Sequence, residues 1–492
     1  MCCAAAACLA VAGPGAGVGL AADAGADSPN IAALYPNPVA EGDASEFVVL
    51  DVPEGTDLSN YQLTDGESTV TLPAVDPGEV ALTSDGTRAA TLAGYRTAPL
   101  DGTLRLSNAG ETVRLLRNGT AVDEASYRNA PESEIFVVGR DTPRWRPLGA
   151  TDRSVVAAGP GQVRAFVLPD AGGLPSRVVA RAEDRILLGG YTLTSERVTR
   201  ALVRAHRRGV TVRVLVDGGP VGGMSRRQVA RLDGLADAGV EVQVVGGPRA
   251  RYRFHHAKYA VVDDRALATS ENWKPAGVGG RGSRGWGVVT NQTAVVEGLA
   301  ETFRADAGWK DAIPWQRARE GVEPVEADPA SGRYGQQFES KTVPVEGTRL
   351  LVAPDNAEST ILDIIGNATD TIDIEQVSIG TRRQPFVQAT LAAARRGVRV
   401  RILLSSAWYT REENQQLVDW LNERASRESL PLEARLAKPR GKFEKIHTKG
   451  VVVDGGQAIV GSLNWNNNSA RNNREVLLVL EGEAVGSYYE RV

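Results

Sequence analysis

Two histidines occupy matching positions in a chain that contains only four. His256 stands two residues before Lys258 and His447 two residues before Lys449, although the whole sequence holds only eight lysines. An imidazole titrates near neutral pH, so it can act as a nucleophile or as a general acid. A lysine ammonium binds the oxygens of an anionic group. The repeated pair therefore predicts chemistry on a phosphodiester.

Predicted strands position these groups. Residues 259–262 and 450–453 read as strands, on which residues two apart face the same side. Asp263 and Asp454 follow at the strand ends, where we expect them to hold the turns rather than to act as acids. The returning strands carry Ser270 and Asn272 in the first copy, and Ser462 and Asn464 in the second. Each hairpin is thus expected to present an imidazole, an ammonium, a hydroxyl and an amide to one place.

The surrounding sequence is itself repeated. Residues 166–170 match 351–355, and residues 205–215 match 394–403. Each copy alternates predicted strands with helices, which indicates an α/β fold. We expect half-domains at 160–312 and 343–492, joined by a linker at 313–342. Two such halves, face to face, would share one active site and bring the two histidines to opposite sides of one phosphorus without a metal.

The motif His-x-Lys-x4-Asp, with Gly461-Ser462-Leu463-Asn464, resembles the signature of the phospholipase D superfamily. The resemblance implies a phosphohistidine intermediate, no metal or other cofactor, and water or an alcohol as acceptor. Members include phospholipases, transphosphatidylases such as cardiolipin synthases, and nucleases. By similarity His256 is the nucleophile and His447 the general acid. Glu475 falls where the family places a carboxylate that orients a histidine.

The first copy departs from this pattern. Residues 283–286 offer no carboxylate, and Thr269 replaces the motif glycine. Two interpretations stay open: the first copy is a weaker site, or it takes a carboxylate from elsewhere, such as Asp217.

The N-terminal third shows no catalytic cluster. Residues 30–130 contain many short alternating segments between turn formers, which predicts a β-sandwich. Residues 35–38 and 58–65 resemble the lamin-tail family, which implies an immunoglobulin-like module that binds a surface or polymer ligand. Residues 131–159 are expected to be a linker. Residues 1–26 hold all three cysteines and resemble a secretory signal, which favours a secreted or cell-surface location.

Composition limits the partners without choosing the substrate. The net charge of −4 argues against a generally cationic nucleic-acid binder. Basic and aromatic residues nevertheless cluster near both motifs: Arg249, Arg251, Arg253, Lys438, Arg440, Lys442, Lys445, Tyr252, Phe254, Trp273, Trp408, Tyr409 and Trp465. Such a cluster suits a cationic mouth for a lipid headgroup or a nucleic-acid backbone, but equally suits solvated loops with core aromatics.

The hypothesis that follows is an exported phosphodiesterase of phospholipase D type acting on a phospholipid headgroup ester. We expect a monomer with an internal pseudo-dimer. The alternatives are a metal-independent nuclease, or a non-catalytic surface-binding protein with a decayed site.

Overall fold

The N-terminal part of the molecule is all β. The computed structural model describes residues 28–38, 46–84, 94–139, 142–247, 250–327 and 330–492, and the signal-like segment 1–26 lies outside them. Two sheets pack together, one ordered β10-β9-β1-β2-β5-β6 and one ordered β4-β3-β7-β8. Their strands are β1 (Asn30–Tyr35), β2 (Phe47–Val52), β3 (Tyr61–Thr64), β4 (Thr69–Thr71), β5 (Gly78–Thr83), β6 (Arg96–Pro99), β7 (Gly110–Arg117), β8 (Thr120–Arg128), β9 (Glu134–Val137) and β10 (Arg144–Pro147).

Side chains of both sheets meet in one apolar core, which includes Leu50, Leu63 and Val113. Asn118 and Gly119 turn β7 into β8, and both have the positive φ that a two-residue hairpin turn favours. The strands β9 and β10 fall within the segment 131–159 that the sequence predicts as a linker, and they complete the larger sheet.

The rest of the chain forms two α/β halves with the same strand order. The first sheet runs β19-β15-β14-β13-β16-β17-β18-β12-β20. The second, given in the matching direction, runs β24-β23-β22-β25-β26-β27-β21-β11. The first half comprises β12 (Gly161–Leu168), α1 (Leu174–Ala180), β13 (Arg185–Gly190), α2 (Glu196–Arg207), β14 (Thr211–Asp217), α3 (Arg226–Asp237), β15 (Glu241–Val245), β16 (Tyr259–Val262), β17 (Arg265–Thr269), β18 (Gly285–Thr290), α4 (Thr293–Ala307), β19 (Ala312–Pro314) and α5 (Trp315–Ala318).

The second half repeats this plan. It comprises β21 (Gly347–Ala353), α6 (Ala357–Gly366), β22 (Thr371–Gln376), α7 (Pro385–Arg395), β23 (Arg399–Leu404), α8 (Arg411–Glu428), β24 (Leu432–Leu436), β25 (Lys449–Val453), β26 (Gln457–Gly461), β27 (Glu475–Glu481) and α9 (Glu483–Glu490). Two short strands, β11 (Val156–Ala158) and β20 (Lys341–Val345), lie between the folding units in sequence. The strand β11 joins the sheet of the second half, whereas β20 joins that of the first.

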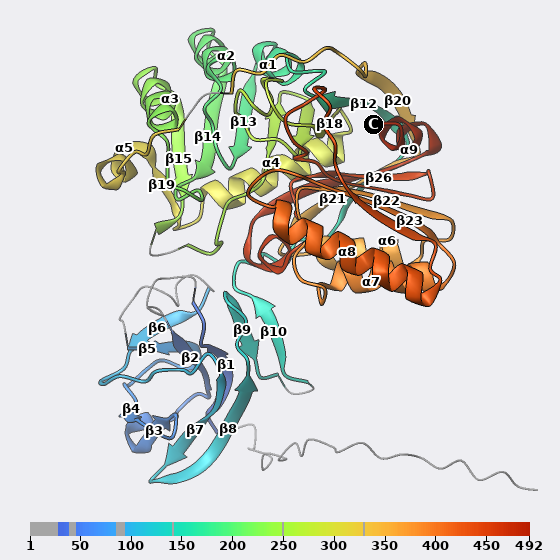
Figure 1. The fold of residues 1–492 in the computed structure, drawn as a ribbon. Helices are drawn as coiled ribbons and strands as arrows, with labels where there is room; N and C mark the ends of the chain where they lie inside the picture. The colour runs from blue at the N-terminus through green and yellow to red at the C-terminus, as the bar shows by residue number, and fades with distance from the viewer. Residues whose placement is uncertain (1–27, 39–45, 85–93, 140–141, 248–249, 328–329) are drawn as a thin grey trace, which may run out of the picture.

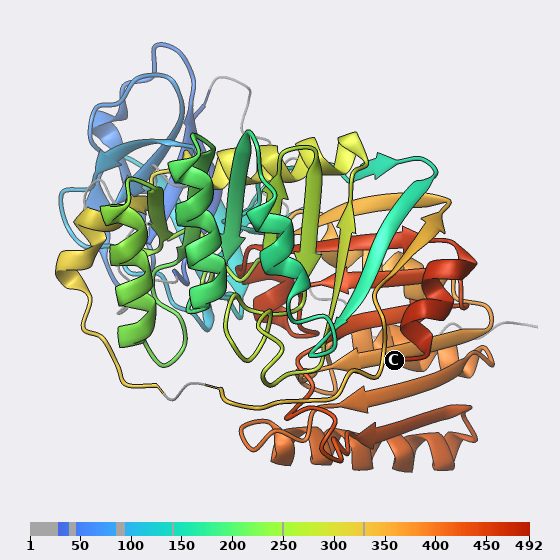
Figure 2. The same ribbon diagram turned by 90° about the horizontal axis from the view of Figure 1, so that it is seen from above.

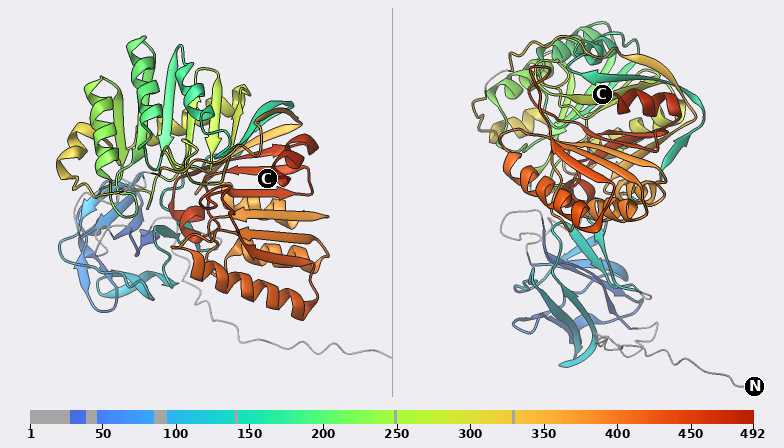
Figure 3. Two further views of the ribbon diagram at one scale, coloured as in Figure 1. Left: turned by 45° about the horizontal axis from the view of Figure 1, so that its top comes forward. Right: turned by 45° about the vertical axis from the view of Figure 1, so that its right-hand side comes forward.

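The two sheets face each other, and their outer faces carry helices. Figures 2 and 3 show α1–α3 on the outside of the first sheet and α6–α8 on the outside of the second. Alternate residues of one strand therefore enter different cores: Leu267 packs outward, while Ala266 and Ala268 face the other half. Because both faces are buried, these strands are continuous apolar runs rather than alternating ones. The core between the sheets also receives α4 and α9.

The β-sandwich lies beside the α/β halves (Figure 1). It contacts them through ion pairs as well as through the chain connection. Glu132 pairs with Arg253, and Glu134 lies 3.5 Å from Arg471. The Thr151 hydroxyl donates to Asp355 over 2.9 Å. Within the described part of the chain, no helix combines the length and the apolar character needed to cross a membrane.

Candidate active site

Each histidine is anchored to the opposite half of the molecule. The backbone N–H of His256 donates to the carbonyl of Arg474 over 3.0 Å, and that of His447 donates to the carbonyl of Arg284 over 2.8 Å. These bonds lie where β18 and β27 begin, at the seam between the two sheets. The two motifs therefore meet at one place rather than forming two separate sites.

Two buried ion pairs fix the carbonyls that receive these bonds. Arg284 lies 2.9 Å from Asp170, and Arg474 lies 2.9 Å from Asp355. The two aspartates end the repeated segments 166–170 and 351–355, whose purpose the sequence alone does not reveal. Breaking a buried pair by removing one partner is strongly destabilising, so each pair holds its strand start firmly. In each half the aspartate therefore fixes the arginine, and the carbonyl of that arginine holds the backbone of the histidine of the other half.

A carboxylate of the second half orients His256. Its Nδ1 lies 2.8 Å from Oε1 and 3.0 Å from Oε2 of Glu475, which is fully buried. Burial lowers the pKa of His256 to about 4 despite the opposing charge of Glu475, and the carboxylate itself stays ionised because its pKa is also lowered. At neutral pH the ring is uncharged. Its Nδ1–H donates to Glu475, so Nε2 keeps a free lone pair.

The surroundings of His447 differ. Its Nδ1 lies 3.1 Å from the carbonyl oxygen of Ser270 and 3.4 Å from Oε2 of Glu271, both in the first half. Burial, reinforced by Lys449 and Lys258, holds the pKa of His447 well below its usual value. Each Nδ1 therefore contacts the opposite half, and that of His447 also lies 3.1 Å from Nζ of Lys449 in its own half.

The two motif lysines are buried and bend back in the same way. Lys258 donates to the carbonyl of His256, and Lys449 donates to the carbonyl of His447 over 2.9 Å. Burial lowers the pKa of Lys449 to about 8 and that of Lys258 well below its usual value. Burial disfavours the charged form of each lysine, and a bound anion restores it. Both ammonium groups are therefore suited to binding a phosphoryl oxygen.

The hydroxyls and amides predicted for the site play different structural parts. Ser270 and Ser462 are fully buried and accept the backbone N–H groups of Trp286 and Val476, over 3.0 and 3.1 Å. Their hydroxyls are therefore occupied within the sheets. Asn272 and Asn464 are only partly buried, and the amide oxygen of each lacks a hydrogen-bond partner among the described residues. Both of these oxygens are buried acceptors, so only the amide N–H groups of the two residues can hold a phosphoryl oxygen.

The motif aspartates lie away from the histidines. Asp263 accepts the backbone N–H groups of residues 183–185, each over 2.9 Å, and Asp454 accepts those of residues 369–371. Although burial opposes them, these bonds lower the pKa of both carboxyls. Both residues have positive φ, which places them in the hairpin turns. This geometry assigns them to the framework.

Asp217 does not supply a carboxylate to the His256 ring, so Asp217 is not the replacement carboxylate of the first copy. Its Oδ2 accepts the backbone N–H of His255 over 2.6 Å, while Glu475 occupies Nδ1 of His256. The sequence also gives no role to Glu271. Aligning the two copies would have pointed to it, because Glu271 stands where the second copy has Leu463.

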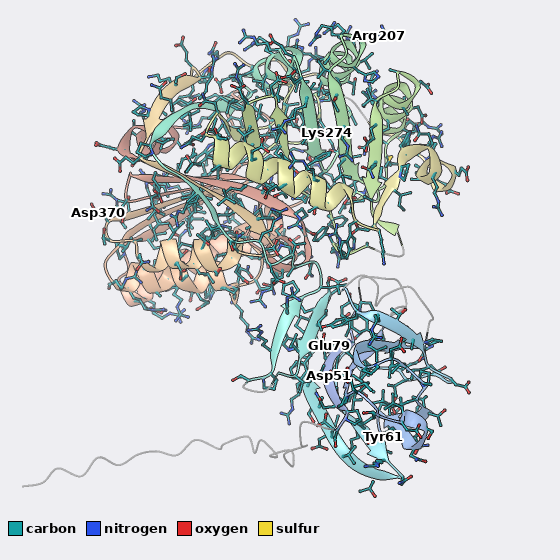
Figure 4. All side chains as sticks on the ribbon, turned by 180° about the vertical axis from the view of Figure 1, so that it is seen from behind. Asp51, Tyr61, Glu79, Arg207, Lys274 and Asp370 are labelled. Atoms are coloured by element: carbon teal, nitrogen blue, oxygen red, sulfur yellow. The ribbon has the colours of Figure 1, made fainter. Side chains whose placement is uncertain are left out.

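The basic and aromatic cluster divides into two groups. Arg251, Tyr252, Trp273 and Trp465 are buried, and Arg251 pairs with Asp311. Lys438, Arg440, Lys442 and Trp408 are exposed, whereas Arg249 lies outside the described residues. Figure 4 shows Lys274 within the first half and Arg207 at the end of α2. Only part of the predicted cationic mouth is therefore open to a ligand.

The comparisons with known proteins agree with this duplicated architecture. A family model described as "Cardiolipin synthase, PLD-like domain" matches residues 176–307 and again residues 361–492, together more than half of the chain. The chain belongs to the phospholipase D superfamily. Its two phospholipase D-like domains correspond to the two α/β halves, so the internal pseudo-dimer and a phosphodiesterase or phosphatidyltransferase type of enzyme follow from the family.

One solved structure shares the fold of the two α/β halves, and two others match parts of the chain. Phosphatidylserine synthase from Haemophilus influenzae Rd KW20 matches 70% of this chain and 85% of its own, with a TM-score of 0.50 at 13% identity. Nuc from Salmonella typhimurium, a phospholipase D family member, matches 32% of this chain and 97% of its own, with a TM-score of 0.28 at 22% identity. NucT from Helicobacter pylori matches 29% and 93%, with a TM-score of 0.25 at 23% identity. No curated protein matches this chain.

Proposed function

We propose that the protein is a phospholipase D-type phosphodiesterase that cleaves a phospholipid headgroup ester through a phosphohistidine on His256. The observation that carries this proposal is the pairing of His256 with Glu475 across the seam. It leaves an uncharged ring with Nε2 free at neutral pH, which is the form a nucleophile needs. His447 acts as the general acid.

The reaction proceeds in two displacements. Nε2 of His256 attacks phosphorus while the bond to the headgroup oxygen breaks, and His447 gives that oxygen a proton. Water, or an alcohol, then attacks the phosphohistidine and gives its proton to His447, while His256 leaves. Lys258, Lys449 and the two site amides hold the phosphoryl oxygens, which carry most charge in the transition state.

Exposed apolar side chains beside the site favour a lipid substrate. Trp408 is 89% exposed and Val221 is 78% exposed, on the loops that follow the equivalent strands β23 and β14. The N–H of Val221 donates to the Tyr191 hydroxyl over 2.6 Å. The rings of Tyr191 and His256 meet edge to face, with 4.8 Å between their centroids. Tyr409, next to Trp408, lies 4.9 Å from the ammonium of Lys445. Large apolar groups this exposed are typical of interaction surfaces.

A nuclease is the second candidate. The exposed Lys438, Arg440 and Lys442 lie on the segment that leads to His447, and they would suit a phosphate backbone. Nucleic-acid binding through such contacts would weaken steeply with salt, whereas insertion of Trp408 into lipid would not.

Parallel assays on two substrates test the proposal. Purified protein in EDTA is given phospholipid vesicles or single-stranded DNA, with the His256→Ala and His447→Ala variants as blanks. We expect headgroup release and a covalent phospho-adduct that maps to His256. Cutting of DNA without headgroup release would establish the nuclease, and the absence of both activities and of any adduct would favour a non-catalytic binding protein.

We further propose that the N-terminal β-sandwich is a lamin-tail-like, immunoglobulin-like module that binds a surface or polymer ligand, and that the protein is secreted or cell-surface. The packed two-sheet core supports an independent module, and segment 1–26 supports export. Co-sedimentation of the chain with cell-envelope material, with and without residues 30–147, tests the binding role. Fractionation of producing cells tests the location.

A further inference from the structure

The two halves differ at one position of their seam. In the first half Gly285 pairs with Leu168, immediately before Pro169, and in the second half Glu475 pairs with Ala353, immediately before Pro354. The strand register thus makes Gly285 the equivalent of Glu475. His447 consequently lacks the carboxyl that His256 receives from the opposite strand.

Space, rather than backbone conformation, accounts for the glycine at this position. Gly285 does not have a positive φ, so its backbone is open to any residue. A Cβ atom on Gly285 would lie 2.6 Å from Oε1 and 2.9 Å from Cδ of Glu271, a separation that atoms do not tolerate. The carboxyl of Glu271 therefore fills the volume that a side chain at 285 would need.

A second glycine bounds the same carboxyl. A Cβ atom on Gly277 would lie 2.7 Å from Oε2 of Glu271. Glu271 is 2% exposed, and its Oε1 has no hydrogen-bond partner among the described residues. A buried, unpaired carboxyl oxygen is costly, and such a group at an active site indicates a functional constraint.

The other oxygen of Glu271 faces His447. Its Oε2 lies 3.4 Å from Nδ1 of His447, the same ring atom that Glu475 binds on His256. In the second half, the position of Glu271 is taken by Leu463, which packs in the apolar core. The first half therefore has its carboxyl just after β17 rather than at the start of the neighbouring strand β18. From there Glu271 still faces an imidazole of the other half.

We propose that Glu271 is the positioning residue of His447, replacing the carboxyl that the repeat places at residue 285. Glu271 lies against Nδ1 of His447, which hydrogen-bonds the Ser270 carbonyl, and the two groups together turn Nε2 toward the leaving oxygen. As a carboxylate, Glu271 balances the charge of the imidazolium. This role rests on the proposed function of His447 as general acid. The site then has a carboxyl on each histidine, and the first copy is not a decayed half.

The environment of Glu271 agrees with a proton held in this pair. Burial raises the pKa of Glu271 to about 8, opposed by four nearby lysines. These are Lys449, Lys258, Lys445 and Lys274. At neutral pH Glu271 therefore keeps its proton inside the site, and its Oε2 lies 3.4 Å from Nδ1 of His447.

A relocation experiment tests the proposal. Glu271→Leu copies the second half at this position, Gly285→Glu restores the carboxyl of the repeat, and the double variant carries both. We expect Glu271→Leu to slow headgroup release about 10²-fold or more, as loss of an orienting carboxylate does in other hydrolases. The double variant should recover at least about tenfold of that loss, and Gly285→Glu alone should be impaired because two carboxyls compete for one space.

Leaving-group dependence distinguishes positioning from a loss of structure. p-Nitrophenolate departs without a proton, so the burst of p-nitrophenol from bis(p-nitrophenyl) phosphate reports attack by His256 alone. Glu271→Gln should leave this burst rate within about threefold of wild type while slowing release of an alcohol headgroup. The matched variant Glu475→Gln should slow both. Equal loss on both substrates in Glu271→Gln would overturn the proposal.

A spectroscopic measurement keeps the test independent of activity. With four histidines in the chain, the ring nitrogens of ¹⁵N-labelled protein can be assigned from the single His→Ala variants. Glu271→Leu should shift the Nδ1–H signal of His447, and the double variant should return it toward wild type. An unchanged His447 signal in a folded Glu271→Leu protein would reject the proposal. Failure of wild type to act on lipid, with the ring shift present, would reject only the lipid substrate.

Discussion

Each reacting ring depends on a side chain from the half that does not carry it. Glu475 orients His256 and Glu271 lies against His447, so each histidine supplies chemistry only in the assembled seam. Replacing either ring with Ala removes a nucleophile or an acid whose loss costs about 10²- to 10⁴-fold in rate. We expect both single variants to lose headgroup release while keeping the circular dichroism and unfolding midpoint of wild type. Near wild-type turnover by either variant would exclude a shared site.

The pH profile of headgroup release should be bell-shaped. Below about pH 4 the His256 ring takes up a proton and cannot attack, so the rate falls as pH drops through that value. Above about pH 8 Glu271 and Lys449 lose their protons, and the rate falls again. Glu475→Gln removes a charge that raises the pKa of His256, so the acid limb should move to lower pH. A shift of that limb to higher pH would contradict the pairing.

Sequence reasoning reaches the motif residues and, through the family resemblance, Glu475, but it does not show which histidine Glu475 orients. Spacing of two along a strand puts His256 beside Lys258, and repetition distinguishes this pair from the other histidines. The partnership with Glu475 spans 219 positions and depends on how two sheets meet, which no local pattern encodes. Glu271 is not predicted because the equivalent residue of the second copy is a leucine. Gly285 indicates only that the first copy lacks a carboxylate at this position.

At the level of elements, the hairpin turns are held by the motif aspartates. Asp263→Gly removes the acceptor of three backbone N–H groups while tolerating the positive φ of the turn. We expect the free energy of unfolding to fall by about 1–3 kcal/mol, from urea titration at neutral pH. Asp264→Ala, one residue later on the exposed side of the turn, serves as the control and should change it by less than about 0.5 kcal/mol. Equal effects of the two variants would refute the framework role.

The exposed apolar side chains on the two loops beside the site allow a separate prediction about binding to lipid vesicles. Trp408→Ser should weaken vesicle binding about tenfold or more, because a buried aromatic side chain contributes on the order of 2 kcal/mol. Val221→Ser should have a smaller effect in the same direction. Leu403→Ser changes an apolar side chain on β23 that is only 36% exposed, and serves as the control in a flotation assay. Unchanged binding in Trp408→Ser would remove the support for a lipid substrate.

Local patterns predict most of these elements for a physical reason. The strands between the halves are buried on both faces and therefore read as unbroken apolar runs. The short strands β9, β10 and β11 lie in the segment 131–159 that is expected to be a linker, and β20 spans the expected boundary at residue 342. They are edge or edge-adjacent strands of three to five residues, too short for a periodic signal.

For the whole molecule, the decisive property is that one chain contains both halves of its site. A mixture of His256→Ala chains with His447→Ala chains should stay inactive, because each chain closes its seam internally and lacks one ring. Recovery of activity on mixing, measured as headgroup release, would show that halves exchange between chains. The wild-type and single-variant chains at the same concentrations provide the reference rates.

The seam also sets how much of a newly made chain must be present before the site can form. His256 leaves the ribosome long before Glu475, and until that carboxylate arrives its ring is free to rotate and to take the wrong tautomer. Synthesis through β27 therefore precedes assembly of the site, because the pairing of His256 with Glu475 forms only when this last long strand joins the second sheet.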